Sequence, residues 1–241
     1  MPGRQTMTPL LVLTAVELEA RVLARELELP LLPAFPFPAF GRATVTVASV
    51  GLRAALCDSR WPSLLGGLDA PLVVSAGVCG ALDPRLAPGD VIIPDRVIDA
   101  RGRSRPISAS HHREALSRLP TLACTAPLVT ANRVVATAEA KASLFASSGA
   151  AAVDMESAII VERGVQAGYP TLVVRAVSDD SRQNVPAELV GLVDSEGRLR
   201  VGRALALTVT RPMTLPSAVG LGRRTRRALR AVAGVLARLV E

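Results

Sequence analysis

Residues 10–27 read LLVLTAVELEARVLAREL and contain two elements in direct succession. Residues 10–16 form a continuous apolar run, which is typical of a strand buried on both faces. In the rest of the stretch the apolar residues recur at helical spacing, at Leu18, Val22, Leu23 and Leu27. A buried strand that turns at once into a helix is the repeating unit of α/β proteins.

The same alternation continues along the chain. Further strands are predicted at residues 44–50, 72–76, 91–93, 96–99, 127–131 and 171–177, with a glycine turn, Gly77 to Gly80, ending the run at 72–76. Helical segments are predicted at residues 52–61, 112–119, 137–148 and 156–168. The proline-rich residues 30–41 are expected to be an irregular connection. We therefore expect a three-layer α/β/α fold with a central mixed sheet.

Length and composition predict one domain over residues 1–241. The chain is long enough for a single large α/β domain, and nothing in the sequence separates two. No long apolar run lacks charges or turn formers, so a membrane-spanning helix is not expected. The first apolar run leads directly into Glu17 and Glu19, which favours a first strand over an export signal.

The cysteines and the charge argue against several classes of function. Cys57, Cys79 and Cys124 are far apart and form no C-x-x-C pair, so neither a disulfide framework nor a zinc site is predicted and a cytoplasmic protein is expected. His111 and His112 have no third metal-type residue nearby. The net charge of +7 would suit nucleic acid, but aromatic residues make up only 2% of the chain and offer no platform for stacking bases.

The C-terminal residues 221–240 are predicted to form a basic amphipathic helix. Its apolar residues recur at helical spacing, at Leu229, Val232, Val235, Leu236 and Leu239. Arginines cluster at its start, at positions 223, 224, 226, 227 and 230. Two interpretations are open: the helix packs on its own domain, or it rests on an anionic membrane and places the protein peripherally at the inner face.

Three acidic residues lie at or near strand–helix junctions, where ligands bind in α/β sheets: Glu19, Glu156 and Asp179. Cleavage of a glycosidic bond needs carboxyl groups of this kind, one to protonate the leaving group and one to handle the nucleophile or the sugar. Taken singly, Glu19 could be an ordinary first-turn glutamate and Asp179 a helix cap.

Three phrases, AVELEA, SAGVCGALDPRLAPGDVIIPD and VDMESAIIVERGVQAGYPTLVVRAVSDDS, resemble the nucleoside phosphorylase and nucleosidase superfamily. The superfamily includes purine nucleoside phosphorylases and methylthioadenosine/S-adenosylhomocysteine nucleosidases, and the resemblance extends over about residues 9–182. Residues 182–227 are similar to the tail of the hopanoid-associated branch, which implies adenosylhopane as the substrate.

The resemblance implies a role for each acid. Asp179 would donate a proton to N7 of the purine, for which an apolar setting at the end of its strand should keep it protonated. Glu156, with Met155 beside it, would hold the 2′ and 3′ hydroxyls of the ribose, and Glu19 would orient or deprotonate the attacking water. Asp154 is expected to be a structural neighbour. The implied substrate-binding set is completed by Val134, Val135, Ser75, Gly77, Val78, Cys79, Gly80 and Ser178.

Two positions depart from the pattern of the hexameric bacterial phosphorylases. These enzymes commonly have an arginine two residues before the first glycine of the G-x-x-G turn and a serine after it, whereas this chain has Ser75 and Val78. Without the arginine a phosphate ion loses a bidentate partner, which favours water as the nucleophile, although Arg53 or Arg133 could compensate. No cofactor is expected, and phosphate stays open as a co-substrate.

We therefore expect an enzyme that releases adenine from an adenine nucleoside, with adenosylhopane as the favoured substrate. The alternatives are a nucleosidase for methylthioadenosine, S-adenosylhomocysteine or futalosine, a purine nucleoside phosphorylase, and a nucleoside-binding accessory protein. The resemblance also implies a homo-oligomer. Phe35, Phe37 and Phe40 either line an apolar opening for a lipid-like substrate or belong to a packed loop.

Overall fold

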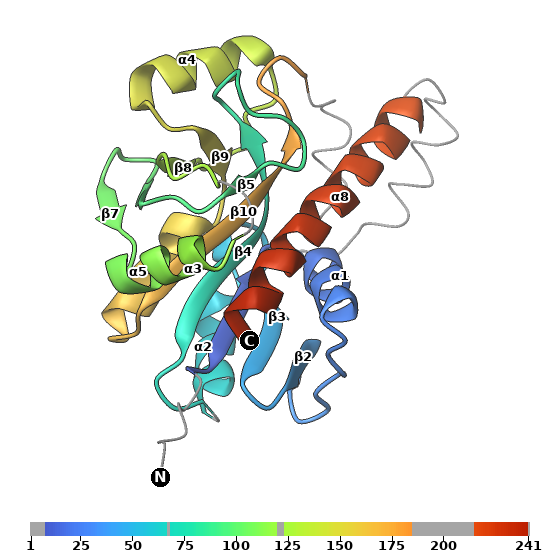
Figure 1. Ribbon diagram of the computed structural model, residues 1–241, viewed down its shortest axis with the longest axis vertical. Coiled ribbons are helices and arrows are strands. Elements are labelled where there is room, and N and C mark those ends of the chain that lie inside the picture. The colour runs from blue at the N-terminus through green and yellow to red at the C-terminus, as the bar shows by residue number, and fades with distance from the viewer. Residues whose placement is uncertain (1–7, 67, 120–122, 185–214, 241) are drawn as a thin grey trace.

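The computed structural model describes residues 8–66, 68–119, 123–184 and 215–240, which form a mixed sheet with helices on both faces (Figure 1). The elements follow in the order β1 (Leu10–Thr14), α1 (Glu17–Glu26), β2 (Ala39–Arg42), β3 (Val45–Ser49), η1 (Leu52–Ala54), α2 (Cys57–Leu65), β4 (Leu72–Ala81), β5 (Val91–Ile92), β6 (Arg96–Ile98), β7 (Ser104–Pro106), α3 (Ala109–Ser117), β8 (Leu128–Thr130), α4 (Ala138–Ser148), β9 (Ala152–Asp154), α5 (Ser157–Gln166), β10 (Thr171–Asp179) and α8 (Leu215–Val240). The predicted fold class is confirmed.

Two long parallel strands, β4 and β10, form the centre of the sheet. β4 also pairs in parallel with β1, β1 with β3, and antiparallel β2 closes this edge. Near its end β4 pairs antiparallel with β9, from which the sheet continues through β8 and β6 to β7. β10 pairs antiparallel with the short β5. The carboxyl ends of β4 and β10 therefore lie side by side, with β9 next to them.

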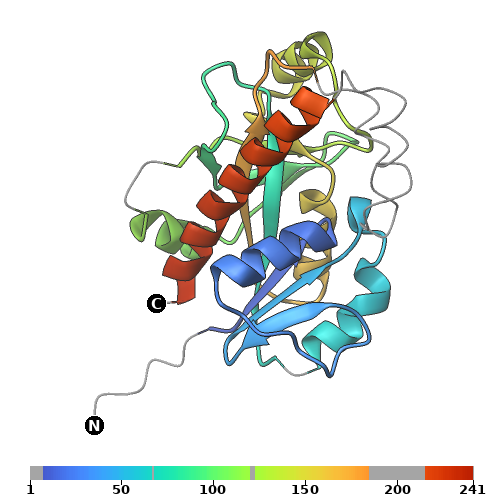
Figure 2. The same cartoon turned by 90° about the vertical axis from the view of Figure 1, so that its right-hand side faces the viewer.

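Alternate side chains of β1 enter different apolar clusters, which explains why residues 10–13 are all apolar. Leu10 and Val12 pack in the cluster that contains α1 and α8, whereas Leu11 and Leu13 pack in the cluster that contains α2. Figure 2 shows α1 and α8 on the near face of the sheet. The strand is thus covered by helices on both sides.

β4 contradicts the prediction of a glycine turn, because it continues without interruption to Ala81. Its glycines instead make room for charged side chains. A Cβ atom at Gly77, whose φ is +149°, would lie 2.5 Å from Nη1 of Arg175 and 2.7 Å from Oε1 of Glu19. A Cβ atom at Gly80 would lie 3.1 Å from Oδ2 of Asp179. The two glycines therefore let functional groups approach the backbone of the central strand.

Three short strands were not predicted. β2 forms at the end of the proline-rich segment, where residues 39–42 pair with β3, and β7 pairs with β6. β9 occupies the apolar residues just before Glu156. Phe35 and Phe37 stack with their ring centroids 5.6 Å apart and pack against the α2 cluster, so the packed-loop interpretation of these residues applies.

The apolar face of α8 is part of the core. Leu229, Val232 and Leu236 are at most 1% exposed, and the helix contacts β10, β4 and α1. The helix starts at Leu215, earlier than predicted, and its packing matches the first of the two interpretations. Within the described ranges, no helix has both the length and the apolar character needed to cross a bilayer.

Candidate active site

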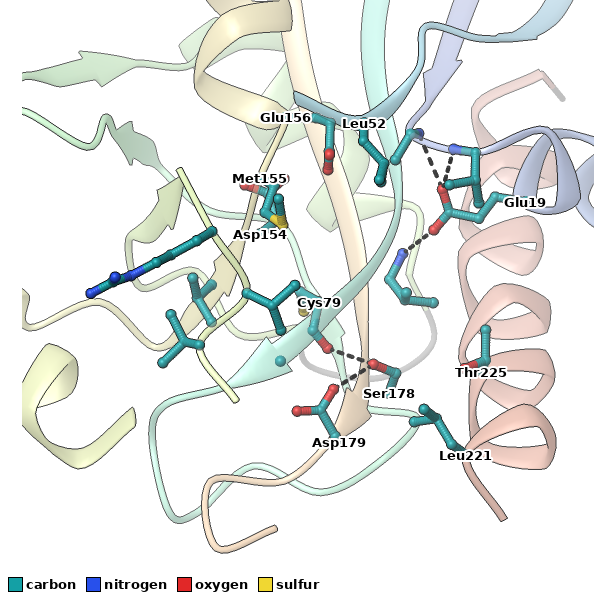
Figure 3. Close-up of a pocket in the computed structure, with 18 residues that line it drawn as sticks. Glu19, Leu52, Cys79, Asp154, Met155, Glu156, Ser178, Asp179, Leu221 and Thr225 are labelled. Atoms are coloured by element: carbon teal, nitrogen blue, oxygen red, sulfur yellow. Dashed lines mark hydrogen bonds between the residues drawn. The ribbon is translucent and has the colours of Figure 1, made fainter. Parts of the chain in front are cut away.

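A cavity of about 290 Å³ opens at the carboxyl ends of β4 and β10. This is near the lower end of the range of about 300–1,000 Å³ that is usual for small-molecule pockets. Its polar wall comes from separate elements: Glu19 from α1, Glu156 from the residue before α5, and Asp179 from the end of β10 (Figure 3). Carboxyl groups that are far apart in the sequence therefore meet at one cavity.

Glu19 lies in the first turn of α1 and is only 4% exposed. Its Oε2 accepts hydrogen bonds from the backbone N–H groups of Ala15 and Val16 (3.1 and 3.3 Å), and Oε1 accepts one from Val78 on β4 (3.0 Å). Burial raises the pKa of Glu19, while the charge of Arg175 and these N–H groups offset part of the rise. A fixed carboxylate with a raised pKa suits a general base.

Glu156 precedes α5 and is 4% exposed. Its Oε1 accepts a hydrogen bond from the backbone N–H of Arg53 (2.8 Å), a residue held in the left-handed region at φ 53°. Burial first, and then the charge of Asp154, raise the pKa of Glu156 to about 7, against the opposing effects of Arg175 and the Arg53 N–H group. Figure 3 shows the carboxylate turned into the cavity, where it can accept further hydrogen bonds.

A buried ion pair supports the cavity, and one of its partners, Asp154, is part of the cavity wall. Arg175 on β10 is fully buried and bonds Asp154 on β9 at 2.8 Å and Ser75 on β4 at 2.8 Å. Asp154 also accepts hydrogen bonds from the Thr130 hydroxyl (2.7 Å) and the Ser157 N–H group (3.0 Å). Nη1 of Arg175 has no hydrogen-bond partner in the described part of the chain. Asp154 on β9 is thus linked directly to β8 and α5, and through Arg175 to β10 and β4, as expected of a structural neighbour.

Asp179 is held by two partners at the end of β10. Its Oδ1 lies 2.7 Å from the hydroxyl of Ser178, and its Oδ2 accepts a hydrogen bond of 2.5 Å from Nζ of Lys141, a fully buried residue of α4. The setting of Asp179 is therefore not purely apolar, because the buried ammonium group of Lys141 contacts one of its oxygens.

The cavity wall contains most of the residues predicted for the site: Glu19, Val78, Cys79, Gly80, Val134, Val135, Met155, Glu156, Ser178 and Asp179. Ser75 and Gly77 are not at the wall. Ser75 lies beneath it, bound to Arg175, and Gly77 makes room for Arg175 and Glu19. Both residues therefore support the site through other side chains rather than touch the cavity.

Sequence reasoning missed several contributors. Arg175 is a charged residue in the middle of the apolar run TLVVRAVSD, which is a signal for a buried, functional cation. Lys141 is the only lysine of the chain. Leu52, Leu221 and Thr225 line the cavity from η1 and α8, and no local pattern marks them.

A family model described as the phosphorylase superfamily matches residues 9–210. The chain belongs to the phosphorylase superfamily. The protein is therefore an enzyme of the N-ribosyl hydrolase or phosphorylase type. A search of curated proteins found no match.

Solved structures agree with the fold of this superfamily protein. It superimposes on the 5′-methylthioadenosine/S-adenosylhomocysteine nucleosidase of Helicobacter pylori with a TM-score of 0.73 and 15% identity, over 98% of this chain and 99% of that one. Futalosine hydrolase of the same organism gives 0.71 and 14%, over 97% of both chains. The nucleosidase of Neisseria meningitidis in complex with methylthio-immucillin-A gives 0.71 and 18%, over 97% and 98%.

The described residues contain no group of three or more His, Cys, Asp or Glu side chains that could hold a metal ion. His112 instead has Nε2 2.8 Å from the carbonyl of Ile93, and His111 has Nδ1 2.8 Å from the Ser108 hydroxyl. The two histidines are thus used in local structure.

Proposed function

We propose that this protein hydrolyses the N-glycosidic bond of an adenine nucleoside and releases adenine. The observation that carries the proposal is the meeting of Glu19, Glu156 and Asp179 at one cavity. The bond breaks through a transition state in which the ribose gains positive charge and the base gains negative charge. Such a reaction needs an acid on one side of the bond and carboxylates on the other.

Asp179 is assigned to the leaving base. The carboxyl group lies at the cavity wall beside Ser178, within the wall that also contains Val134 and Val135. A purine lying along these valines would present N7 to Asp179, and a proton on N7 lets the base leave as neutral adenine.

Glu156 is assigned to the sugar. Both of its oxygens are acceptors when it is ionised, and Oε1 is fixed by the Arg53 N–H group. Two vicinal ribose hydroxyls can donate to such a carboxylate. The negative charge also stabilises the positive charge that develops on the ribose, so the interaction strengthens in the transition state.

Glu19 is assigned to the attacking water. Its carboxylate lies at the cavity wall and is fixed by the backbone N–H groups of Ala15, Val16 and Val78, so it can accept a hydrogen bond from a water in the cavity. A phosphate dianion would instead be repelled by the nearby carboxylates of Glu19 and Glu156. These contacts support hydrolysis over phosphorolysis.

Adenosylhopane is the substrate that we favour. Apolar residues from η1 and α8, Leu52 and Leu221, line the cavity and would suit a large apolar group at C5′ of the ribose. The tail that resembles the hopanoid-associated branch lies mostly outside the described residues. A nucleosidase for methylthioadenosine, S-adenosylhomocysteine or futalosine is the alternative, and the superimposed structures bear those names.

We also propose that the protein forms a homo-oligomer and that it contacts a membrane peripherally. Because the apolar face of α8 is packed into the core, contact with an anionic membrane would depend on its exposed arginines at positions 223, 226, 227 and 230.

Asp179→Asn tests the assignment of the acid. The variant keeps the shape of the side chain but cannot donate a carboxyl proton, so adenine release, followed by chromatography, should fall at least about a hundredfold. Asp95→Asn, on the surface beside Arg96, is the matched control and should change little. Adenine release by Asp179→Asn at the rate of the control would remove Asp179 from the reaction.

A further inference from the structure

Lys141 is the only lysine of the chain and has no exposed surface. It lies in the first turn of α4 and is the only buried residue of that helix. Burying an ammonium group costs free energy unless its charge is fully compensated, so the burial of Lys141 needs an explanation. The other basic residues are all arginines, which hold their protons too tightly to release them in a protein.

All three N–H groups of the Lys141 ammonium are used. Nζ donates to Oδ2 of Asp179 at 2.5 Å, to the carbonyl of Asp180 at 2.7 Å and to the carbonyl of Gln183 at 3.0 Å. Asp179 is the only carboxylate among these acceptors. The pair is therefore net neutral and stays buried without a further counter-ion.

The surroundings of Asp179 accept either of its protonation states. The Ser178 hydroxyl has one hydrogen but lies within bonding distance of two acceptors, Oδ1 of Asp179 at 2.7 Å and the carbonyl of Cys79 at 3.1 Å. When Asp179 is ionised, Ser178 can donate to Oδ1. When a proton has moved from Nζ of Lys141 to Oδ2 of Asp179, Ser178 can still donate to Oδ1, and the Oδ2–H group can donate to the neutral amine of Lys141.

The contact between Lys141 and Asp179 places a proton next to the carboxyl group at the cavity wall. Nζ of the Lys141 ammonium donates a hydrogen to Oδ2 of Asp179 at 2.5 Å. A proton that moves along this hydrogen bond reaches Oδ2.

We propose that Lys141 and Asp179 form a dyad that stores the proton taken up by the leaving base. This inference rests on the proposed function.

The proton moves in two steps. The Nζ–H bond of Lys141 breaks and an O–H bond forms on Asp179. This O–H bond then breaks as the N7–H bond of the base forms. The electron pair of the C1′–N9 bond leaves with the base, and water loses its proton to Glu19 as its oxygen bonds C1′. Exchange of protons with solvent returns Lys141 and Glu19 to their starting forms. Lys141 acts through Asp179 and is a positioning residue.

Other charged groups near the dyad do not replace Lys141. Cys79 faces Asp179 from β4, but burial raises the pKa of its thiol well above the usual value, so it stays neutral. Asp180 binds the Arg182 N–H group after β10. Glu139 on α4 and Arg133 on the preceding loop are exposed. Proton delivery to the leaving base is therefore assigned to Lys141 and Asp179.

The experiment compares Lys141→Met with the wild type over pH 5–10 on two ribosides with the same C5′ substituent. One carries adenine, which needs a proton to leave, and the other carries 4-nitrophenolate, which does not. Loss of the stored proton should lower adenine release about a hundredfold at pH 8 and move its alkaline limb to lower pH. The loss on the nitrophenyl riboside should be at least about tenfold smaller, because its leaving group needs no acid. Glu139→Gln on the same helix is the control and should match the wild type.

Equal losses on both ribosides, or an unchanged pH profile, would overturn the dyad. If Lys141→Met does not fold, the wild type alone decides: adenine release must persist above pH 7 and then decline with pH while nitrophenolate release does not. Parallel profiles for the two leaving groups would contradict the inference. A wild type that cleaves neither riboside would refute the proposed function itself, whereas cleavage of both with a normal Lys141→Met profile would refute the dyad alone.

Discussion

Glu156→Gln should make the protein more stable and much less active. Burial and the charge of Asp154 raise the pKa of Glu156 from 4.5 to about 7. A difference of about 2.5 at about 1.4 kcal/mol per pH unit corresponds to about 3 kcal/mol against the ionised form. A neutral glutamine of the same shape avoids this cost and can still accept a hydrogen bond from the Arg53 N–H group.

The sign of the pH dependence follows from the raised pKa. Between about pH 4.5 and 7 the folded protein keeps a proton on Glu156 that the unfolded chain has released. The free energy of unfolding therefore falls as pH rises through this window, and the substitution removes the fall. Wild type and variant should be similarly stable near pH 5, and the variant should be more stable by up to about 3 kcal/mol at pH 8.

Urea unfolding at pH 5, 6, 7 and 8 measures the difference in stability, and adenine release measures activity. The exposed Glu139→Gln is the control and should leave both unchanged. The variant should lose at least about a hundredfold in kcat, because glutamine supplies neither the second acceptor nor the negative charge at the ribose. In the wild type kcat/KM should decline as pH falls below about 7. A variant that is less stable at pH 8, or whose stability difference does not change with pH, would refute this reasoning.

Three further substitutions test groups at the cavity wall and beneath it. Glu19→Gln should lower hydrolysis at least about a hundredfold in adenine release while thermal unfolding shows a folded protein; retained activity would exclude the general base. Gly77→Ala should destabilise the protein by about 3 kcal/mol in urea unfolding, because its Cβ atom would lie 2.5 Å from Arg175. Gly102→Ala, which shares a positive φ but has nothing within 4 Å, should cost only about 1 kcal/mol, and equal effects would contradict the steric account. Asp154→Asn should cost about 3–5 kcal/mol by leaving Arg175 unpaired and should move the acidic limb of kcat/KM to lower pH; an unshifted limb would argue against the Asp154 contribution to the Glu156 pKa.

The layered fold could be predicted because each element carries its own pattern. Residues 10–16 are apolar except for Thr14, since alternate side chains enter different clusters, and the structure forms β1 there. β4 was cut short in the prediction because Gly77 and Gly80 look like a turn. Their actual role depends on Arg175, Glu19 and Asp179, which approach from other elements, and no local pattern records such long-range contacts.

The acidic residues of the site could be predicted from the sequence, but the side chains that surround them could not. Glu19, Glu156 and Asp179 lie at or near strand–helix junctions, which the sequence pattern predicts. The partner of Asp179 is Lys141, 38 residues away on α4, and only the folded chain brings them together. α8 likewise adds Leu221 and Thr225 to the cavity from beyond the region whose motifs were recognised. Pairings of this kind depend on topology rather than on spacing.

The most direct test of the proposed activity is the release of free adenine by the wild type with and without phosphate. The substrates are adenosine, methylthioadenosine and an adenosine that carries a long apolar group at C5′. We expect adenine from the apolar nucleoside at the same rate in both conditions, with far less from the small substrates. Release that requires phosphate would contradict water as the nucleophile, and no adenine from any of the three would contradict the proposed function.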